Sequence, residues 1–109
     1  MATGQMTRID DLQPELVELL GSNNVYFQPP ESLKLKYPCI VYELNKIDKL
    51  PANNLMYRAD RSYSVTLIHQ DPDNDIVDKM LQRPLSSFDR AFVSDNLHHF
   101  VFTFYLRRK

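Results

Sequence analysis

The sequence predicts a single α+β domain across residues 1–109, with two helices packed on one face of a mainly antiparallel sheet of four to five strands. Two segments place apolar residues three and four positions apart, as one face of a helix requires. Four longer segments alternate in the way strands do. With 109 residues, the chain can bury about two-thirds of the surface that its unfolded form exposes, so a core needs no metal or disulfide.

The first helix is predicted at residues 9–21. Its apolar face is formed by Ile9, Leu12, Leu16, Leu19 and Leu20. Asp10 or Asp11 can cap its start, and Pro14 is tolerated in a first turn. Gly21 can adopt the left-handed conformation that ends a helix.

A short strand and a long hairpin follow, after a flexible tail expected at residues 1–7. Residues 25–27 form a short apolar run before two prolines, which predicts an edge strand. Residues 39–44 are β-branched and aromatic, and residues 57–69 alternate well, which predicts two antiparallel partners. Residues 45–56 between them are mostly polar, so they predict the mobile tip of this hairpin.

The second helix and a final hairpin complete the predicted order. Asp71 and Pro72 have the chemistry of a cap and a first turn, and Pro84 ends the helix. Its apolar stripe consists of Ile76, Val77, Met80 and Leu81. Residues 87–93 and 97–107 then predict two strands around a tight turn at residues 94–96. The last strand is the most aromatic, with Phe100, Phe102, Phe104 and Leu106 on one face.

Two helices of about three turns cover one face of such a sheet but not both. The last strand carries Val101, Thr103 and Tyr105 on its other face, which is therefore mixed. A mixed, uncovered face favours a protein partner, most simply further copies of the same chain. The alternative remains that scattered exposed apolar residues are normal on any protein surface.

Charge and composition exclude several functions. The formal net charge of −1 argues against a protein whose main task is to bind nucleic acid or anionic lipid. Two glycines, Gly4 and Gly21, exclude both a glycine-rich phosphate loop and the paired-glycine dinucleotide fingerprint. No apolar stretch reaches the roughly 18 residues that cross a bilayer, and residues 1–10 lack an apolar signal core, so we expect no membrane contact and a cytosolic protein.

The residues that could carry chemistry do not form a recognisable site. His98 and His99 are adjacent in a predicted strand and point to opposite faces, so they do not bind one metal readily. Cys39 lies in an apolar strand, which predicts a buried thiol rather than a nucleophile. Asp71 begins a run of aspartates, but Ile76 and Gln82 stand where a calcium loop needs glycine and glutamate. We therefore expect no catalytic residue, no cofactor and no metal.

Two stretches resemble a known protein family. They are residues 61–73, RSYSVTLIHQDPD, and residues 86–102, SSFDRAFVSDNLHHFVF. These stretches are similar to small tail proteins of long-tailed bacteriophages and of prophages in Gram-positive bacteria, often termed minor capsid or tail completion proteins. The likeness extends from about residue 12 to residue 107, and it rests on structural strings rather than on a site motif.

The resemblance implies a tail terminator, a structural virion assembly protein that is not an enzyme. Its copies form a ring, usually a hexamer, that caps the tail tube at the head-proximal end and joins it to the head-completion proteins. Assembly takes place in the bacterial host cytoplasm, and DNA passes through the ring without specific binding. The resemblance transfers no functional residue. Candidate interface residues lie at the hairpin tip and at a strand end: Lys46, Lys49, Asn53, Asn54, Tyr57 and Tyr105.

Three other functions remain open. A head-side connector or stopper protein has a similar size but docks on the portal. A small hydrolase could use an acid together with His69, His98 or His99. A DNA-binding regulator fits least well, because the basic residues are spread along the chain and balanced by acids.

Overall fold

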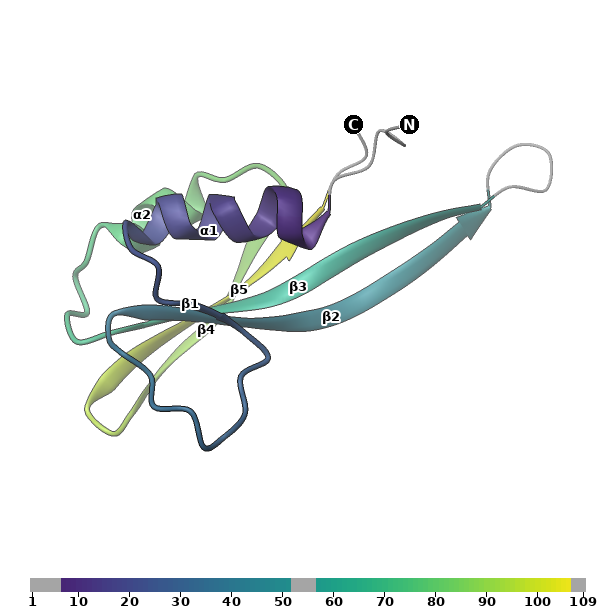
Figure 1. Cartoon of the computed structure of the whole chain (residues 1–109). Helices are drawn as coiled ribbons and strands as arrows, with labels where there is room; N and C mark the ends of the chain where they lie inside the picture. The colour runs from purple at the N-terminus through teal and green to yellow at the C-terminus, as the bar shows by residue number, and fades with distance from the viewer. Residues whose placement is uncertain (1–6, 52–56, 107–109) are drawn as a thin grey trace.

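The computed structural model describes residues 7–51 and 57–106 (Figure 1). In chain order the elements are the π-helical segment η1 (Arg8–Leu12), α1 (Gln13–Leu20), β1 (Val25–Phe27), β2 (Cys39–Pro51), β3 (Tyr57–His69), α2 (Ile76–Leu81), β4 (Ser86–Ser94) and β5 (Leu97–Tyr105). The strands form one five-stranded sheet in the order β1-β2-β3-β5-β4. Both helices lie on the same side of it (Figure 1). The predicted α+β architecture is confirmed.

The sheet is mixed rather than purely antiparallel. β2, β3, β5 and β4 pair antiparallel in succession, whereas β1 lies parallel to β2. β1 pairs over only three residues, opposite Ile40, Val41 and Tyr42. It is the short edge strand that the sequence predicts, and its direction follows from the long connection that returns the chain to β2.

The first helix begins with a cap that the sequence analysis misplaced. Thr7 is the N-cap: its Oγ1 accepts a hydrogen bond from the backbone N–H of Asp10 at 3.1 Å, and its own N–H donates to Asp11 Oδ2 at 2.7 Å. Such reciprocal bonds satisfy two N–H groups at once. The prediction that Asp10 or Asp11 is the cap is therefore wrong, and Thr7 belongs to the helix rather than to a tail. Residues 1–6 of that predicted tail lie outside the described residues.

The other end of this helix agrees with the prediction. Pro14 lies in the first turn of α1, and Gly21 ends it with a φ of 83°. Positive φ favours glycine because other residues place a Cβ against the backbone there. The second helix, in contrast, begins later than predicted. Asp71 Oδ1 accepts from the N–H of Asp73 at 2.9 Å and so closes a turn. The N-cap of α2 is Asp75, and Asn74 Oδ1, just before it, accepts from the Val77 N–H of the first turn at 3.1 Å.

The core lies between the helices and the sheet face that they cover. Its completely buried side chains are Leu12, Leu16, Ile40, Tyr42, Val65, Leu67, Met80, Phe102 and Phe104. The aromatic face predicted for the last strand is therefore confirmed. Tyr42 is held by two polar partners, accepting from Arg8 Nη1 at 3.0 Å and donating to Gln13 Oε1. Burial raises the pKa of this tyrosine.

Arg83, which follows α2, connects α1 to the sheet. Its Nε donates to Glu15 Oε2 at 2.6 Å, and its guanidinium lies 4.5 Å from the centroid of the Phe104 ring. Its remaining nitrogens donate to three backbone carbonyls, those of Pro84, Leu85 and Tyr105. Because the Arg83 side chain is only 8% exposed, these bonds hold a nearly buried charge.

The β2–β3 hairpin reaches beyond the rest of the sheet. β2 continues through Pro51 after a shift of register between Leu44 and Lys46. The predicted tip at residues 45–56 is thus strand as far as residue 51, and residues 52–56 lie outside the described residues. β5 pairs with β3 only from Ser62 onward. Residues 46–51 and 57–61 therefore form a two-stranded projection, which we term the arm (Figure 1).

The last hairpin has the predicted tight turn. Asp95 and Asn96 have φ values of 54° and 62°, the conformation that two-residue hairpin turns require. β4 is the other edge of the sheet, and it is interrupted by a shift of register between Phe88 and Arg90. Because of this bulge, Arg90 and Phe92 lie on the opposite face of the sheet from Phe88.

Candidate interaction surface

The arm joins the body at a row of three neighbouring residues. Lys46 on β2 pairs with Ser62 on β3, and Ser62 pairs with Tyr105 on β5. Ser62 is buried and accepts a hydrogen bond from Asn45 Nδ2 at 3.1 Å. Tyr105 is 45% exposed. Two of the predicted interface residues, Lys46 and Tyr105, are therefore brought to one row on one face of the sheet.

The other predicted interface residues are more dispersed. Lys49 and Tyr57 lie on the arm, where Lys49 pairs with Ala59 and Tyr57 pairs with Pro51. Asn53 and Asn54 lie outside the described residues. The structure thus places four of the six candidates along the arm and at its base, without gathering them into a single pocket.

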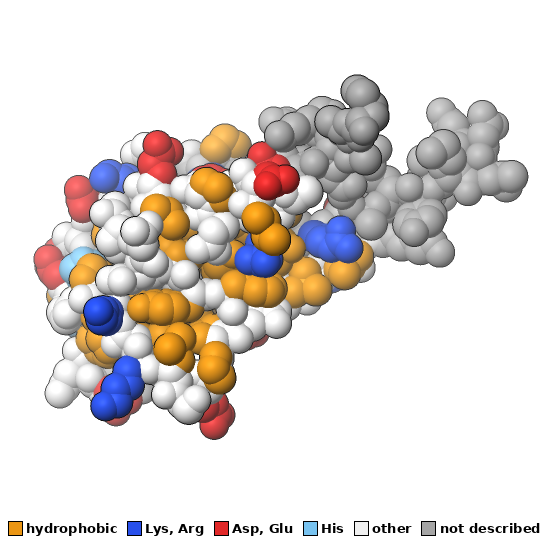
Figure 2. Space-filling model, in the orientation of Figure 1, with side chains coloured by type: hydrophobic (Ala, Val, Ile, Leu, Met, Phe, Trp, Pro, Cys, Tyr) orange, Lys and Arg blue, Asp and Glu red, His pale blue; other side chains and the backbone are white. Residues whose placement is uncertain are grey.

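The described side chains of the arm are in contact with solvent. Ile47 is 47% exposed and Leu44, just before the arm, is 39% exposed. Lys46 Nζ lies 3.3 Å from Asp48 Oδ1, and both side chains are exposed. Figure 2 shows hydrophobic side chains, some beside basic ones, on the face of the body that this view presents. Apolar side chains exposed beside charged ones belong to a protein surface rather than to a core.

The sheet face away from the helices is mixed, as predicted, and we term it the open face. Its residues form rows of cross-strand neighbours that run from β2 to β4. One row consists of Cys39, Ile68, His99 and Phe92. The next row consists of Val41, Thr66, Val101 and Arg90. The third row consists of Glu43, Ser64 and Thr103, whose Oγ1 donates to Asp89 Oδ2 at 2.7 Å.

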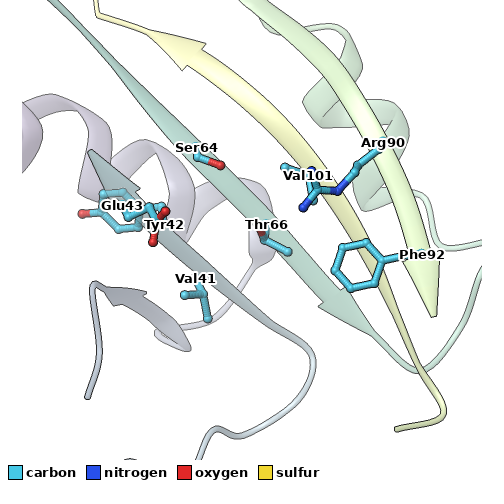
Figure 3. A pocket seen from close by; sticks show the side chains of 8 residues that line it. All are labelled: Val41, Tyr42, Glu43, Ser64, Thr66, Arg90, Phe92 and Val101. Atoms are coloured by element: carbon cyan, nitrogen blue, oxygen red, sulfur yellow. The ribbon is translucent and has the colours of Figure 1, made fainter. Parts of the chain in front are cut away.

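A shallow hollow lies in the middle of the open face (Figure 3). Its volume is about 170 Å³, and it is lined by Val41, Tyr42, Glu43, Ser64, Thr66, Arg90, Phe92 and Val101. Figure 3 shows Arg90 and Phe92 reaching from β4 toward β3, with Glu43 on the other side of the hollow on β2. Ser64 and Thr66 lie between them. The hollow therefore has a cationic and aromatic wall, an anionic wall and a floor of small side chains.

Sequence reasoning missed this hollow because it missed the bulge in β4. Strict alternation would place Phe88, Arg90 and Phe92 on one face. Phe88 instead packs against Phe102 on the helical side, at 5.3 Å between ring centroids, while Phe92 stacks on His99 on the open face at 4.6 Å. Nothing in the alternation itself marks where a bulge falls.

The histidines and the cysteine do not converge. His69 Nδ1 accepts from the N–H of Asp71 at 2.9 Å, His99 stacks on Phe92, and Ile68 stands between His99 and Cys39 in their row. Cys39 is completely buried, and burial raises the pKa of its thiol to about 11. Within the residues that the structure describes, no three His, Cys, Asp or Glu side chains group as metal ligands would.

Comparison with known proteins adds no assignment: no family model and no curated protein matches this chain. No helix in the described part of the chain is both long enough and apolar enough to cross a membrane.

Proposed function

We propose that this chain is a ring-forming tail terminator, a tail completion protein of a long-tailed bacteriophage or prophage. Its copies assemble into a ring, a hexamer by the family resemblance, that caps the tail tube and joins it to the head-completion proteins. The observation that supports this proposal most directly is the arm. It extends the β2–β3 hairpin past the strands that flank it in the body.

An arm of this kind gains stability from a neighbour. A two-stranded hairpin alone is marginally stable in water, because it has no third strand or helix to bury its apolar residues. Ile47 remains 47% exposed. On its outer side, β2 pairs with β1 only at Ile40, Val41 and Tyr42, so residues 46–51 have no second strand beside them in the described pairing. Such edges are templates for another chain. Docking on a second subunit would bury the exposed apolar side chain of Ile47 and would give the open strand edge a hydrogen-bonding partner.

A ring requires two different surfaces on each subunit, because a head-to-tail contact joins unlike patches. In the sheet order, β5 separates the arm strands β2 and β3 from β4, which forms the other edge of the sheet. β4 is exposed along almost its whole length and carries Phe88, Phe92 and Val93 at 45%, 41% and 61% exposure. The arm of one copy and the β4 edge of the next are therefore the two surfaces that we assign to the ring contact.

The net charge supports the same role. A ring through which DNA moves must not hold the phosphate backbone strongly, since each phosphate contact adds affinity. The net charge of −1 suits passage better than binding.

The test mixes the purified protein with polymerised tail tubes of the phage that encodes it and images the tube ends by negative-stain electron microscopy. We expect rings at one end of each tube. Ile47→Asp, on the arm, should abolish them. The control Leu81→Asp should not, because Leu81 is similarly exposed, at 51%, but lies on α2. Binding to portal-containing heads instead of tube ends would replace the terminator with a head-side connector, and binding to neither would reject both.

A further inference from the structure

We infer that the open face is a contact between two copies of this chain packed face to face, with Glu43 of each copy opposite Arg90 of the other. This contact goes beyond the proposed ring, which uses the arm and the β4 edge. It concerns the middle of the sheet on the side that carries no helix, a surface that meets the β4 edge at Phe92 (Figures 1 and 3).

The first observation is a pair of opposite charges that do not meet within one chain. Glu43 on β2 and Arg90 on β4 are exposed and line opposite sides of the hollow. Neither forms an ion pair among the described residues. The guanidinium of Arg90 lies only against its own neighbour, 5.5 Å from the centroid of the Phe92 ring. Each copy therefore presents Glu43 on one side of a floor of small residues and Arg90 on the other. The carboxylate of Asp89, next to Arg90, already accepts a hydrogen bond from Thr103 Oγ1 at 2.7 Å.

The second observation is that this arrangement is complementary to itself. Stacked sheets keep their strands within about 30° of each other and lie about 10 Å apart. A two-fold axis that runs between the sheets, roughly along the strands, places β2 of one copy over β4 of the other. Glu43 and Arg90 occupy neighbouring rows, an offset of about 7 Å, which the crossing angle and the long arginine side chain can span. Two-fold symmetry then forms the pair twice.

The floor of the hollow suits such a contact. Ser64, Thr66 and Val41 are half-buried, and Phe92 beside them is 41% exposed. In the stacked arrangement, the Phe92 ring of each copy lies over the part of β2 in the other copy that carries Val41. The contact would thus bury an aromatic ring at its centre, with the charges around it, as specific protein interfaces do.

The size of the face sets the expected strength. β3 and β5 pair over eight residue positions, and four strands of that length cover about 19 by 26 Å, or about 500 Å² per copy. Two such faces bury about 1,000 Å² in total, near the lower limit for specific association. We therefore expect a weak dimer, with a dissociation constant in the micromolar range, that salt weakens further.

The test is sedimentation velocity of the full chain at concentrations from about 5 to 500 μM, a range that brackets micromolar dissociation constants. Wild type should shift from monomer to dimer. Arg90→Glu and Glu43→Arg should each raise the dissociation constant at least tenfold, because each places like charges in contact. The double variant, which exchanges the charges, should return it to within about threefold of wild type. Lys79→Glu on α2 is the control and should leave it unchanged.

Three results would overturn the inference: a monomer at every concentration, a dimer that the single reversals leave intact, or a double variant that fails to recover. A dimer sensitive to Ile47→Asp but not to Arg90→Glu would also overturn it, since that contact belongs to the arm. Thermal unfolding followed by circular dichroism shows whether each variant is folded. Binding to tube ends is measured in a separate experiment, so a result against the face-to-face contact can be distinguished from a result against the proposed ring.

Discussion

One hairpin of this molecule passes through two different environments. Within the body, β2 and β3 lie between other strands and beneath α1, and Ile40, Tyr42 and Val65 are completely buried. Beyond Ser62 the same two strands continue as the arm, where Ile47 is 47% exposed. The backbone pairing is continuous from one part to the other except at Asn45. What differs is whether the side chains have anything to pack against.

This contrast separates the residues that hold the fold from those available for contact. Burial of apolar side chains is the main favourable term in folding, so the body should carry nearly all of the stability of the domain. The arm should carry little. Substitutions of matched residues in the body and on the arm test whether the body carries the stability. The loss in the free energy of unfolding is expected to fall from several kcal/mol in the core to almost nothing on the arm.

The largest effect is expected for Phe102→Ala. Phe102 is completely buried and packs edge-on against Phe88 and Phe104. Its truncation leaves a cavity that the surrounding strands cannot close, so the free energy of unfolding should fall by about 3–5 kcal/mol. Urea denaturation measures this. Phe92→Ala on the open face is the control, with an expected loss below about 1 kcal/mol; equal losses would contradict the assignment of the core to the helical side.

The next effect concerns the junction of helix and sheet. Arg83→Ala removes the ion pair with Glu15, three hydrogen bonds to carbonyls and the contact with the Phe104 ring. Glu15 is then left without its cation, and we expect unfolding to become easier by about 2–4 kcal/mol. Arg90→Ala, which loses only an exposed ring contact, should cost less than about 0.5 kcal/mol. Similar values for the two arginines would show that Arg83 is not structural.

Alkaline pH should weaken the body through Cys39. Burial raises the pKa of its thiol from the ordinary 9.0 to about 11, so the folded protein keeps a proton that the unfolded chain releases. The stabilisation is complete below pH 9 and is lost as the pH rises through about 11, by as much as about 2–3 kcal/mol. Urea denaturation at pH 8 to 11 should show this decline, and Cys39→Ala should reduce it. The rise in the pKa of Tyr42 acts in the same direction, so a smaller decline should persist in that variant.

The sequence predicted the body better than the arm for a physical reason. Residues 62–69 alternate because one side of β3 is buried in the body, and the predicted bounds 57–69 match the strand. Residues 45–51 show no such pattern, since two strands without a covering layer have no buried side to enforce it. Local hydrogen bonds account for other errors: Asp71 closes a turn with its own side chain, and Thr7 rather than Asp10 or Asp11 caps the first helix.

The candidate site was recovered only in part. Lys46 was predicted as part of the polar hairpin tip and Tyr105 as part of the last strand, and the structure places the two in one row at the base of the arm. Glu43, Arg90 and Phe92 on the open face were not predicted as a group, because the bulge between Phe88 and Arg90 decides which face the last two occupy. A bulge depends on pairing between distant strands, which one chain segment does not reveal.

The smallest effect on stability is expected for a substitution on the arm. The clearest comparison of arm and body uses two isoleucines of one strand. Ile40 and Ile47 belong to the same strand, but Ile40 is completely buried and Ile47 is half exposed. Ile40→Ala should lower the free energy of unfolding by about 2–5 kcal/mol, whereas Ile47→Ala should change it by less than about 1 kcal/mol, because little apolar area leaves contact with other residues. Urea denaturation of the two variants measures the difference. If the arm is a contact surface, Ile47→Ala should nevertheless weaken ring formation on tube ends, so that one substitution separates assembly from folding. Comparable destabilisation by the two substitutions would instead mean that the arm is packed as part of the core, and its role as a free docking element would have to be abandoned.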